Sequence, residues 1–246
     1  MLKQYDLALT MLNKSLEIDP DLAETYLLKG KIYYKKKDYE KAVEEFTKAI
    51  EKDPKYEKAY DERAWVFEKL EDLELALADY TQAIIINPVN SSYYYSRARL
   101  FHETRNFDAA IEDCTKALII KPDDVFSFIL RGRSYFSLKE YDHAFIDLKE
   151  AVKLNPVYKK LYLDIEADYH IMNKDYDLAI ENYTKIISID EDWYALIYKK
   201  RGMCYELQEL NYLALQDYRT FVSKAGEGFK DEVEDAKERI ERLSEK

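Results

Sequence analysis

The sequence predicts an all-α solenoid, a fold in which pairs of helices stack one after another. Glycine and proline, five of each, make up about 4% of the 246 residues. Average usage is roughly 12%, and a β-sandwich or barrel needs more turn residues than this chain has. The five prolines also stand 34 residues apart, at Pro20, Pro54, Pro88, Pro122 and Pro156. A fixed period of this length is typical of repeat proteins.

Each proline follows an amphipathic segment, as in SLEIDP before Pro20 and AIEKDP before Pro54. Proline lacks the backbone N–H that a helix needs to continue, so it marks a helix end. Each interval between prolines therefore holds one helix pair with a turn.

Small residues recur with the same period as the prolines. One series lies ten residues after each of the first four prolines, at Gly30, Ala64, Ala98 and Gly132. A second series follows twelve residues later, at Ala42, Ala76, Ala110 and Ala144. Two helices cross closely where a small residue leaves room, and large aromatic side chains fill the gaps beside the crossing.

This pattern resembles the tetratricopeptide repeat from Met1 to about Gly226. The resemblance implies a right-handed superhelix of helix-turn-helix repeats, with six complete repeats over residues 23–226. Their first helices are expected to begin near Ala23, Glu57, Ser91, Val125, Lys160 and Ala195. The register slips by one residue between Pro156 and Ala167 and by one more within 190–194, where the least regular stacking is expected.

The two ends are expected to differ from the repeats between them. Residues 1–19 match only the second helix of a repeat, and two explanations are open: the chain is a piece of a longer array, which we favour, or something else covers the exposed face. Residues 227–246 carry one apolar stripe on an otherwise charged segment, at Phe229, Val233, Ala236, Ile240 and Leu243. This stripe predicts a C-terminal capping helix, which terminal repeats require.

The formal net charge of −11 argues against non-specific binding of nucleic acid, which needs a basic face. Polar residues interrupt the longest uncharged stretch, Tyr80 to Ser96, so no membrane-spanning segment is expected. Cys114 and Cys204, the two cysteines, stand far apart without the even spacing of a disulfide scaffold. We therefore expect a reduced, intracellular and cytoplasmic setting.

No catalytic, metal or cofactor site is predicted. His102, His143 and His170 lack cysteine or carboxylate partners at the spacing of metal ligands. Cys114 takes a position that is aromatic in other repeats, so a packed core role is expected. The phosphate-binding and nucleophile motifs rich in glycine are absent as well. We therefore expect a protein that is not an enzyme.

The family resemblance implies that the first helices line a concave binding face. At the positions concerned, the fourth repeat is apolar where a solvated groove is expected to be polar. The residues expected to bind a partner are Trp65, Tyr95, Arg99, Phe126, Ile129, Leu130, Arg133 and Phe136. Exposed apolar patches and arginine–aromatic clusters are typical of interaction surfaces. The alternative is that these residues pack against a neighbouring helix.

Two ligand patterns of the family are missing from this chain. The clamp for a chaperone's C-terminal carboxylate requires Lys and Asn where the first frame has Leu27, Lys31, Glu62, Ser92 and Ser96. The asparagine ladder of the sugar-transferase members is replaced by Leu28, Glu62, Ser96, Leu130, Ile165 and Lys200. Neither of these two ligand classes is therefore expected.

The sequence thus predicts a scaffold that binds a peptide segment or a partner helix in the groove of a solenoid. Arg99 and Arg133 would suit an acidic segment, because arginine forms bidentate hydrogen bonds with carboxylates. Two alternatives stay open. One is a non-catalytic regulatory or targeting region of a larger multidomain enzyme. The other is a structural scaffold that self-associates through the uncovered helix of residues 1–19.

Overall fold

The computed structural model describes residues 2–190 and 194–245, and the side chains from residue 4 onward within them. These residues form α-helices and two short 3₁₀ helices, with no strand among them. The α-helices are α1 Leu2–Ile18, α2 Ala23–Lys35, α3 Tyr39–Lys52, α4 Glu57–Lys69, α5 Leu73–Ile86, α6 Ser91–Glu103, α7 Phe107–Ile120, α8 Val125–Ser137, α9 Tyr141–Leu154, α10 Lys159–Met172, α11 Tyr176–Ile189, α12 Leu196–Leu207, α13 Asn211–Lys224 and α14 Lys230–Ser244.

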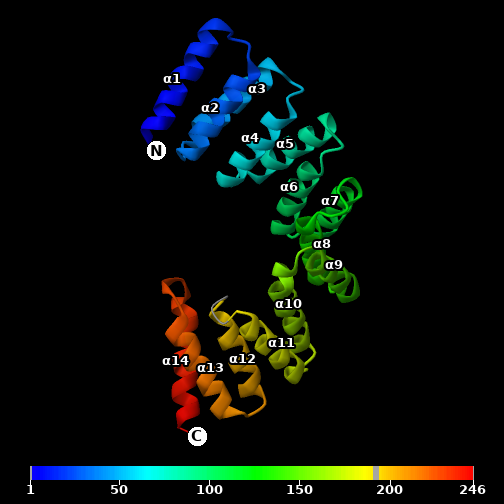
Figure 1. The fold of residues 1–246 in the computed structure, drawn as a ribbon, viewed down its shortest axis with the longest axis vertical. Helices are drawn as coiled ribbons and strands as arrows, with labels where there is room; N and C mark the ends of the chain where they lie inside the picture. The colour runs from blue at the N-terminus through cyan, green and yellow to red at the C-terminus, as the bar shows by residue number, and fades with distance from the viewer. Residues whose placement is uncertain (1, 191–193, 246) are drawn as a thin grey trace. The chain divides into compact units, whose positions relative to one another are not determined.

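The chain divides into two compact units, Met1–Asp147 and Leu148–Lys246, and the boundary falls inside α9. In the first unit α2 packs on α3, α4 on α5 and α6 on α7; in the second, α10 packs on α11, α12 on α13 and α13 on α14 (Figure 1). The first five of these pairs are antiparallel helix hairpins of the kind that the 34-residue period predicts, and the last is the packing of a C-terminal helix on the final repeat. The fold is an all-α solenoid.

The helices begin close to the residues that the sequence predicts. The first helices of four repeats start at Ala23, Glu57, Ser91 and Val125, as expected. At the first register slip, the 3₁₀ helix Pro156–Tyr158 takes up the extra residue, and α10 starts at Lys159. The second slip lies largely at 191–193, outside the described residues, and α12 starts at Leu196.

The small residues of the sequence pattern stand where two helices cross. A Cβ atom added to Gly30 would lie 2.5 Å from Cε1 of Phe46, which is fully buried. At Gly202 the same atom would lie 3.0 Å from Cε1 of Tyr218. The aromatic ring of the second helix thus occupies the space that a side chain would take on the first.

The turn between the two helices of a repeat contains one residue in the left-handed conformation. Lys37, Glu71, Arg105, Lys139, Lys174 and Glu209 have φ between 61° and 65°. Their backbone N–H groups bond to carbonyls of the first helix, as when Lys37 N donates to the Tyr34 carbonyl at 2.9 Å. Glycine is the usual residue here, so the chain accepts a small conformational cost at each turn.

Three of the many tyrosines have a structural role tied to the prolines. The hydroxyl groups of Tyr26, Tyr60 and Tyr94 donate hydrogen bonds to the carbonyls of Pro20, Pro54 and Pro88, at 3.1, 3.4 and 3.2 Å. Each bond ties the start of a repeat to the turn before it. Each of these tyrosines lies six residues after its proline, but the sequence pattern alone does not reveal the hydrogen bond.

A repeated arginine joins neighbouring repeats. Arg63 donates to Asp79 of its own repeat at 2.7 and 2.9 Å and to Thr47 of the preceding repeat at 2.9 Å. The same three-residue arrangement recurs at Arg97 with Asp113 and Thr81, at Arg131 with Asp147 and Thr115, and at Arg201 with Asp217 and Thr184. Bidentate pairs of this kind fix geometry as well as charge, so each arginine ties a first helix to the second helix of its own repeat and to that of the preceding repeat.

Candidate protein-binding face

The residues predicted to bind a partner lie on three first helices of the first unit: Trp65 on α4, Tyr95 and Arg99 on α6, and the other five on α8. We call the surface that these helices present the α4–α6–α8 face. Its members differ in exposure. Phe126 is 55% exposed and Trp65 36%, whereas Ile129 and Leu130 are only 9% and 7% exposed.

Leu130 belongs to a buried cluster with Ala98 and Cys114, and Tyr95 packs against it. At Leu130 and Ile129 the structure therefore favours packing, which was the alternative explanation for the apolar fourth repeat. Because a side chain buried in this way offers no surface to a ligand, we leave these two residues out of the proposed contact surface.

Trp65 and Arg99 meet at the junction of α4 and α6. The Arg99 guanidinium lies 4.6 Å from the Trp65 ring centroid, a cation–π distance. Arg99 also pairs with Glu68 at 2.6 Å and with Glu103 at 2.8 Å. Two carboxylates thus already balance the Arg99 charge, so Arg99 is a poor anchor for an acidic segment.

The aromatic residues of α8 fall into two groups. Phe126 lies 6.2 Å from Tyr95, centroid to centroid, and this pair joins α8 to α6. Phe136 instead makes edge-to-face contacts with Tyr141 and Phe145 of α9, at 5.2 and 6.4 Å. Phe126 therefore belongs to the exposed part of the face, while Phe136 is half-buried against the second helix of its own repeat.

Arg133 is exposed, and no carboxylate among the described residues lies within ion-pair distance of it. Burial and the nearby Arg133 charge both lower the pKa of His102. His102 Nδ1 lies 2.9 Å from Ser134 Oγ, so this histidine is packed and hydrogen-bonded between α6 and α8. Arg133 is thus the cation of the face best placed to meet an anionic group.

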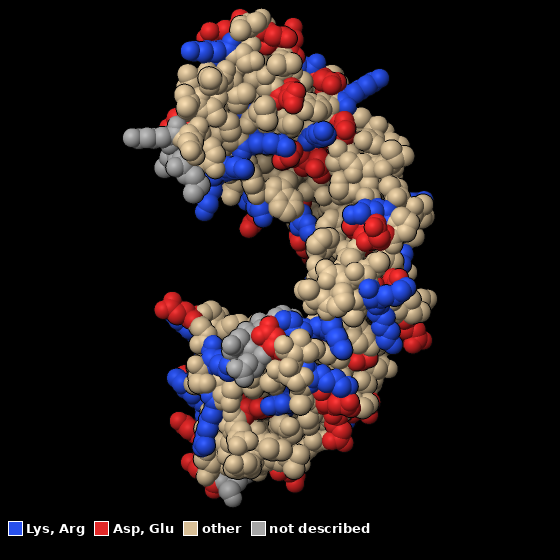
Figure 2. Space-filling view, viewed as in Figure 1, with Lys and Arg blue, Asp and Glu red and all other residues tan. Residues whose placement is uncertain are grey.

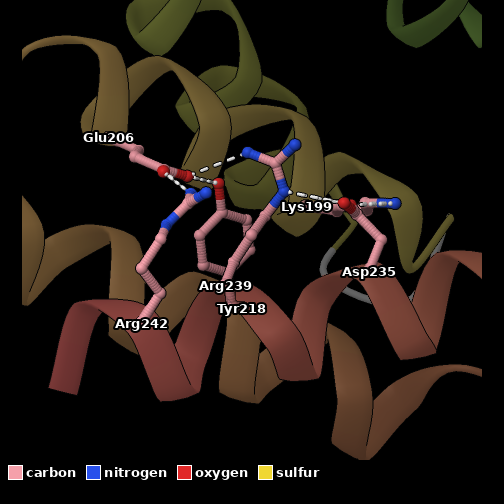
Figure 3. A network of polar contacts seen from close by, with 6 residues as sticks. All are labelled: Lys199, Glu206, Tyr218, Asp235, Arg239 and Arg242. Atoms are coloured by element: carbon pink, nitrogen blue, oxygen red, sulfur yellow. Dashed lines mark hydrogen bonds and ion pairs between the residues drawn. The ribbon is translucent and has the colours of Figure 1, made fainter. Parts of the chain in front are cut away.

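In the second unit, the capping helix α14 packs on α13 and pairs with Lys199 and Glu206 on α12, the first helix of the last repeat (Figure 3). Arg239 donates to Glu206 at 2.9 Å, Arg242 also pairs with Glu206, and Lys199 pairs with Asp235 at 2.8 Å. Although burial raises the pKa of Glu206, hydrogen bonds from Tyr218 and Arg239 hold it below its usual range. The capping helix is thus held by charge as well as by its apolar stripe.

An apolar pocket of about 530 Å³ opens between α1 and α2. Met11 on α1 is 62% exposed and Leu28 on α2 is 43% exposed. The lining residues are Tyr5, Ala8, Met11, Leu12, Leu28, Lys31, Ile32 and Lys35. An apolar surface of this kind, formed here by α1 and α2 together, is suited to contact with another helix.

Groups suited to chemistry are sparse in the described part of the chain. No cluster of three or more His, Cys, Asp or Glu residues there is arranged to hold a metal ion. Both cysteines are free and buried, and burial raises the pKa of the Cys204 thiol to about 12 and that of the Cys114 thiol further. A thiol with so high a pKa is a poor nucleophile.

Lys and Arg side chains lie among Asp and Glu on the face drawn in Figure 2 rather than forming one basic stripe. Over residues 2–190 and 194–245, every helix is too short or too polar to span a bilayer.

Sequence models described as tetratricopeptide repeat match residues 2–37, 23–56, 62–125 and 127–158. No protein in a search of curated sequences matches the chain. A crystal structure of MamA is 26% identical, covers 62% of this chain and 89% of its own, and has a TM-score of 0.58. Two solved structures at 18% identity share the fold more completely. The match to the C-terminal part of a tetratricopeptide repeat-containing protein from Cytophaga hutchinsonii covers 93% of this chain and 94% of that part, with a TM-score of 0.72. PilF from Pseudomonas aeruginosa covers 91% and 97%, with a TM-score of 0.68.

Proposed function

Because the chain belongs to the tetratricopeptide repeat family, we propose that it is a non-catalytic scaffold that binds a segment of another protein on the α4–α6–α8 face. One observation carries the proposal. Phe126 and Arg133 lie exposed on the same helix, with Tyr95 and Trp65 beside them on the two preceding first helices. Large aromatic residues and arginine are the usual anchors of protein interfaces.

The binding mechanism is preorganisation. The Arg63, Arg97 and Arg131 bonds tie each first helix of this face to the repeat before it. A surface that is already fixed loses little conformational entropy when a partner segment binds. The segment itself is expected to be a peptide or a helix, with an apolar residue against Phe126 and a carboxylate at Arg133.

Partner capture with single-residue variants tests this function. Phe126→Ala and Arg133→Glu should each weaken capture of a cellular partner by about tenfold or more, as truncation of an interface anchor does. Ile119→Ala and Lys116→Glu make matched changes at exposed positions of α7, a second helix of the same unit, and should leave capture unchanged. Equal capture by all five proteins, wild type included, would place the partner on another surface.

A second candidate, self-association, is favoured by the apolar pocket between α1 and α2. A helix from another copy of the chain would bury the exposed Met11 and Leu28 side chains there. Sedimentation should then show mass rising with protein concentration, and Met11→Lys should keep the protein monomeric. A concentration-independent monomer mass for the wild type would reject this candidate.

A further inference from the structure

A pocket of about 300 Å³ lies at the junction of α4 and α6, in the second and third repeats. Its walls include three aromatic side chains, a serine and two carboxylates. The lining residues are Tyr34, Asp61, Glu62, Trp65, Tyr80 and Ser96. The volume lies at the lower end of the range for ligand pockets.

Asp61 is the acidic residue of this pocket that has no partner. Glu62 pairs with Lys31 at 2.7 Å, whereas Asp61 makes no hydrogen bond or ion pair with any residue that the structure describes. Burial, with the neighbouring Glu62, raises the pKa of Asp61 to about 7. The nearby Lys31 ammonium, which pairs with Glu62, lowers the Asp61 pKa but does not offset the effect of burial.

The equivalent junction in the second unit shows what such a carboxylate binds. Asp164 occupies the same repeat position in the fifth repeat as Asp61 does in the second. The Lys200 ammonium donates to Asp164 at 2.8 Å and to Asp168 at 3.1 Å, and lies 5.9 Å from the centroid of the Tyr183 ring. The chain thus supplies its own lysine to this site.

Ser96 stands at the repeat position of Lys200, and Tyr80 stands at that of Tyr183. The second repeat therefore has the aromatic ring and one of the two carboxylates, because Trp65 stands at the repeat position of Asp168. A short neutral side chain replaces the lysine. Among the six complete repeats, only the second and the fifth have aspartate at this position; the others have Leu27, Tyr95, Ile129 and Lys199. The pocket lies where the missing ammonium group would be.

We propose that the pocket lined by Asp61, Trp65 and Ser96 binds the side-chain ammonium group of a lysine from a partner polypeptide. The ammonium takes the place that Lys200 fills at the fifth repeat. It pairs with the Asp61 carboxylate, and its methylene groups lie beside the partly exposed Trp65 side chain. The pocket adjoins the α4–α6–α8 face through Trp65, so the biological role of the lysine rests on the proposed function.

A small probe tests the pocket without any knowledge of the partner. n-Butylammonium reproduces the end of a lysine side chain, n-butanol is its neutral counterpart, and ethylguanidinium represents arginine. The indole N–H of Trp65, which donates to the Tyr34 hydroxyl at 2.7 Å, provides an NMR signal at the pocket wall. We expect saturable shifts of this signal with n-butylammonium and binding of n-butanol weaker by about tenfold or more, since a charged hydrogen bond is lost.

Three variants complete the test. Asp61→Asn should weaken n-butylammonium binding by about tenfold. Ser96→Lys should abolish it, because the new side chain fills the pocket as Lys200 does. Asp108→Asn, the same change at an exposed position of α7, should bind like the wild type.

Equal affinity for n-butylammonium and n-butanol, or full binding by Asp61→Asn, would overturn the proposal. Tighter binding of ethylguanidinium would overturn the assignment to lysine and replace it with arginine. Failure here is distinct from failure of the proposed function, because capture of a partner through Phe126 and Arg133 does not require Asp61.

Discussion

The second and fifth repeats each have an aspartate at the same repeat position, but the two aspartates have different surroundings. Asp164 is bonded by Lys200 of the following repeat, whereas Asp61 faces Ser96 and an open pocket. At the last repeat, α14 plays the part of a following helix, since Arg239 bonds Glu206 from outside the repeat. Whether a groove residue is available thus depends on the next helix as much as on the residue itself.

This dependence also explains the fourth repeat. Leu130 lies at the same repeat position as Ser96 and Lys200, and its side chain is buried with Ala98 and Cys114. Phe126, four residues earlier on α8, stays 55% exposed. The family pattern assigns all of these positions to the binding face. In the structure, some are closed to a ligand by packing, some are closed by an ion pair, and others are left open.

The largest expected effect separates a position closed by packing from an open one. Leu130→Asp should lower the free energy of unfolding by about 4 kcal/mol, because it removes buried apolar contact and buries a charge. Phe126→Asp should cost about 1 kcal/mol, since an exposed ring loses only part of its contact. Urea unfolding followed by circular dichroism measures both, and equal losses would remove the distinction.

A smaller effect separates a position closed by an ion pair from the open pocket. Lys200→Met should lower the free energy of unfolding by about 2 kcal/mol, because it leaves half-buried Asp164 and Asp168 without their cation. Ser96→Met, at the equivalent position, should change it by less than about 0.5 kcal/mol. If urea unfolding gives the two variants the same stability, Lys200 does not close its site.

The smallest effect depends on pH. The folded-state pKa of Asp61, about 7, lies above its ordinary value of 3.8, so the folded protein holds the proton more tightly than the unfolded chain. Stability is therefore lost as pH rises from about 4 to about 7, and the loss is complete above pH 7. Asp61→Asn should be more stable than wild type by about 1 to 2 kcal/mol at pH 8, after allowance for solvent screening, and should approach it at pH 5.

Urea unfolding at the two pH values checks this difference. A stability gap between Asp61→Asn and wild type that does not change from pH 5 to pH 8 would show that Asp61 ionises normally in the folded protein.

Much of the fold could be predicted because it depends on local chemistry. The five prolines mark helix ends, and Gly30 marks a crossing where the Phe46 ring leaves no room for a side chain. Such signals are written in single residues at a fixed period. The helix starts at Ala23 and Glu57 therefore agree with the sequence.

The site could be predicted only in part, because contacts between repeats decide it. The sequence pattern placed Trp65, Arg99 and Phe126 on first helices but did not reveal that Glu68 and Glu103 balance Arg99. It also gave no sign that Asp61 lacks a partner while Asp164 has one. Comparison of Ser96 with Lys200 across repeats was the signal that could have found this difference.

Selection of displayed random peptides tests the central claim most directly. Wild-type protein and the Asp61→Asn/Arg133→Glu double variant would be used side by side as bait. We expect peptides selected on the wild type to carry a lysine and an acidic residue at a constant spacing and to lose binding to the double variant. Selected peptides without a shared lysine, or with equal affinity for both proteins, would contradict a ligand-binding face built around Asp61 and Arg133.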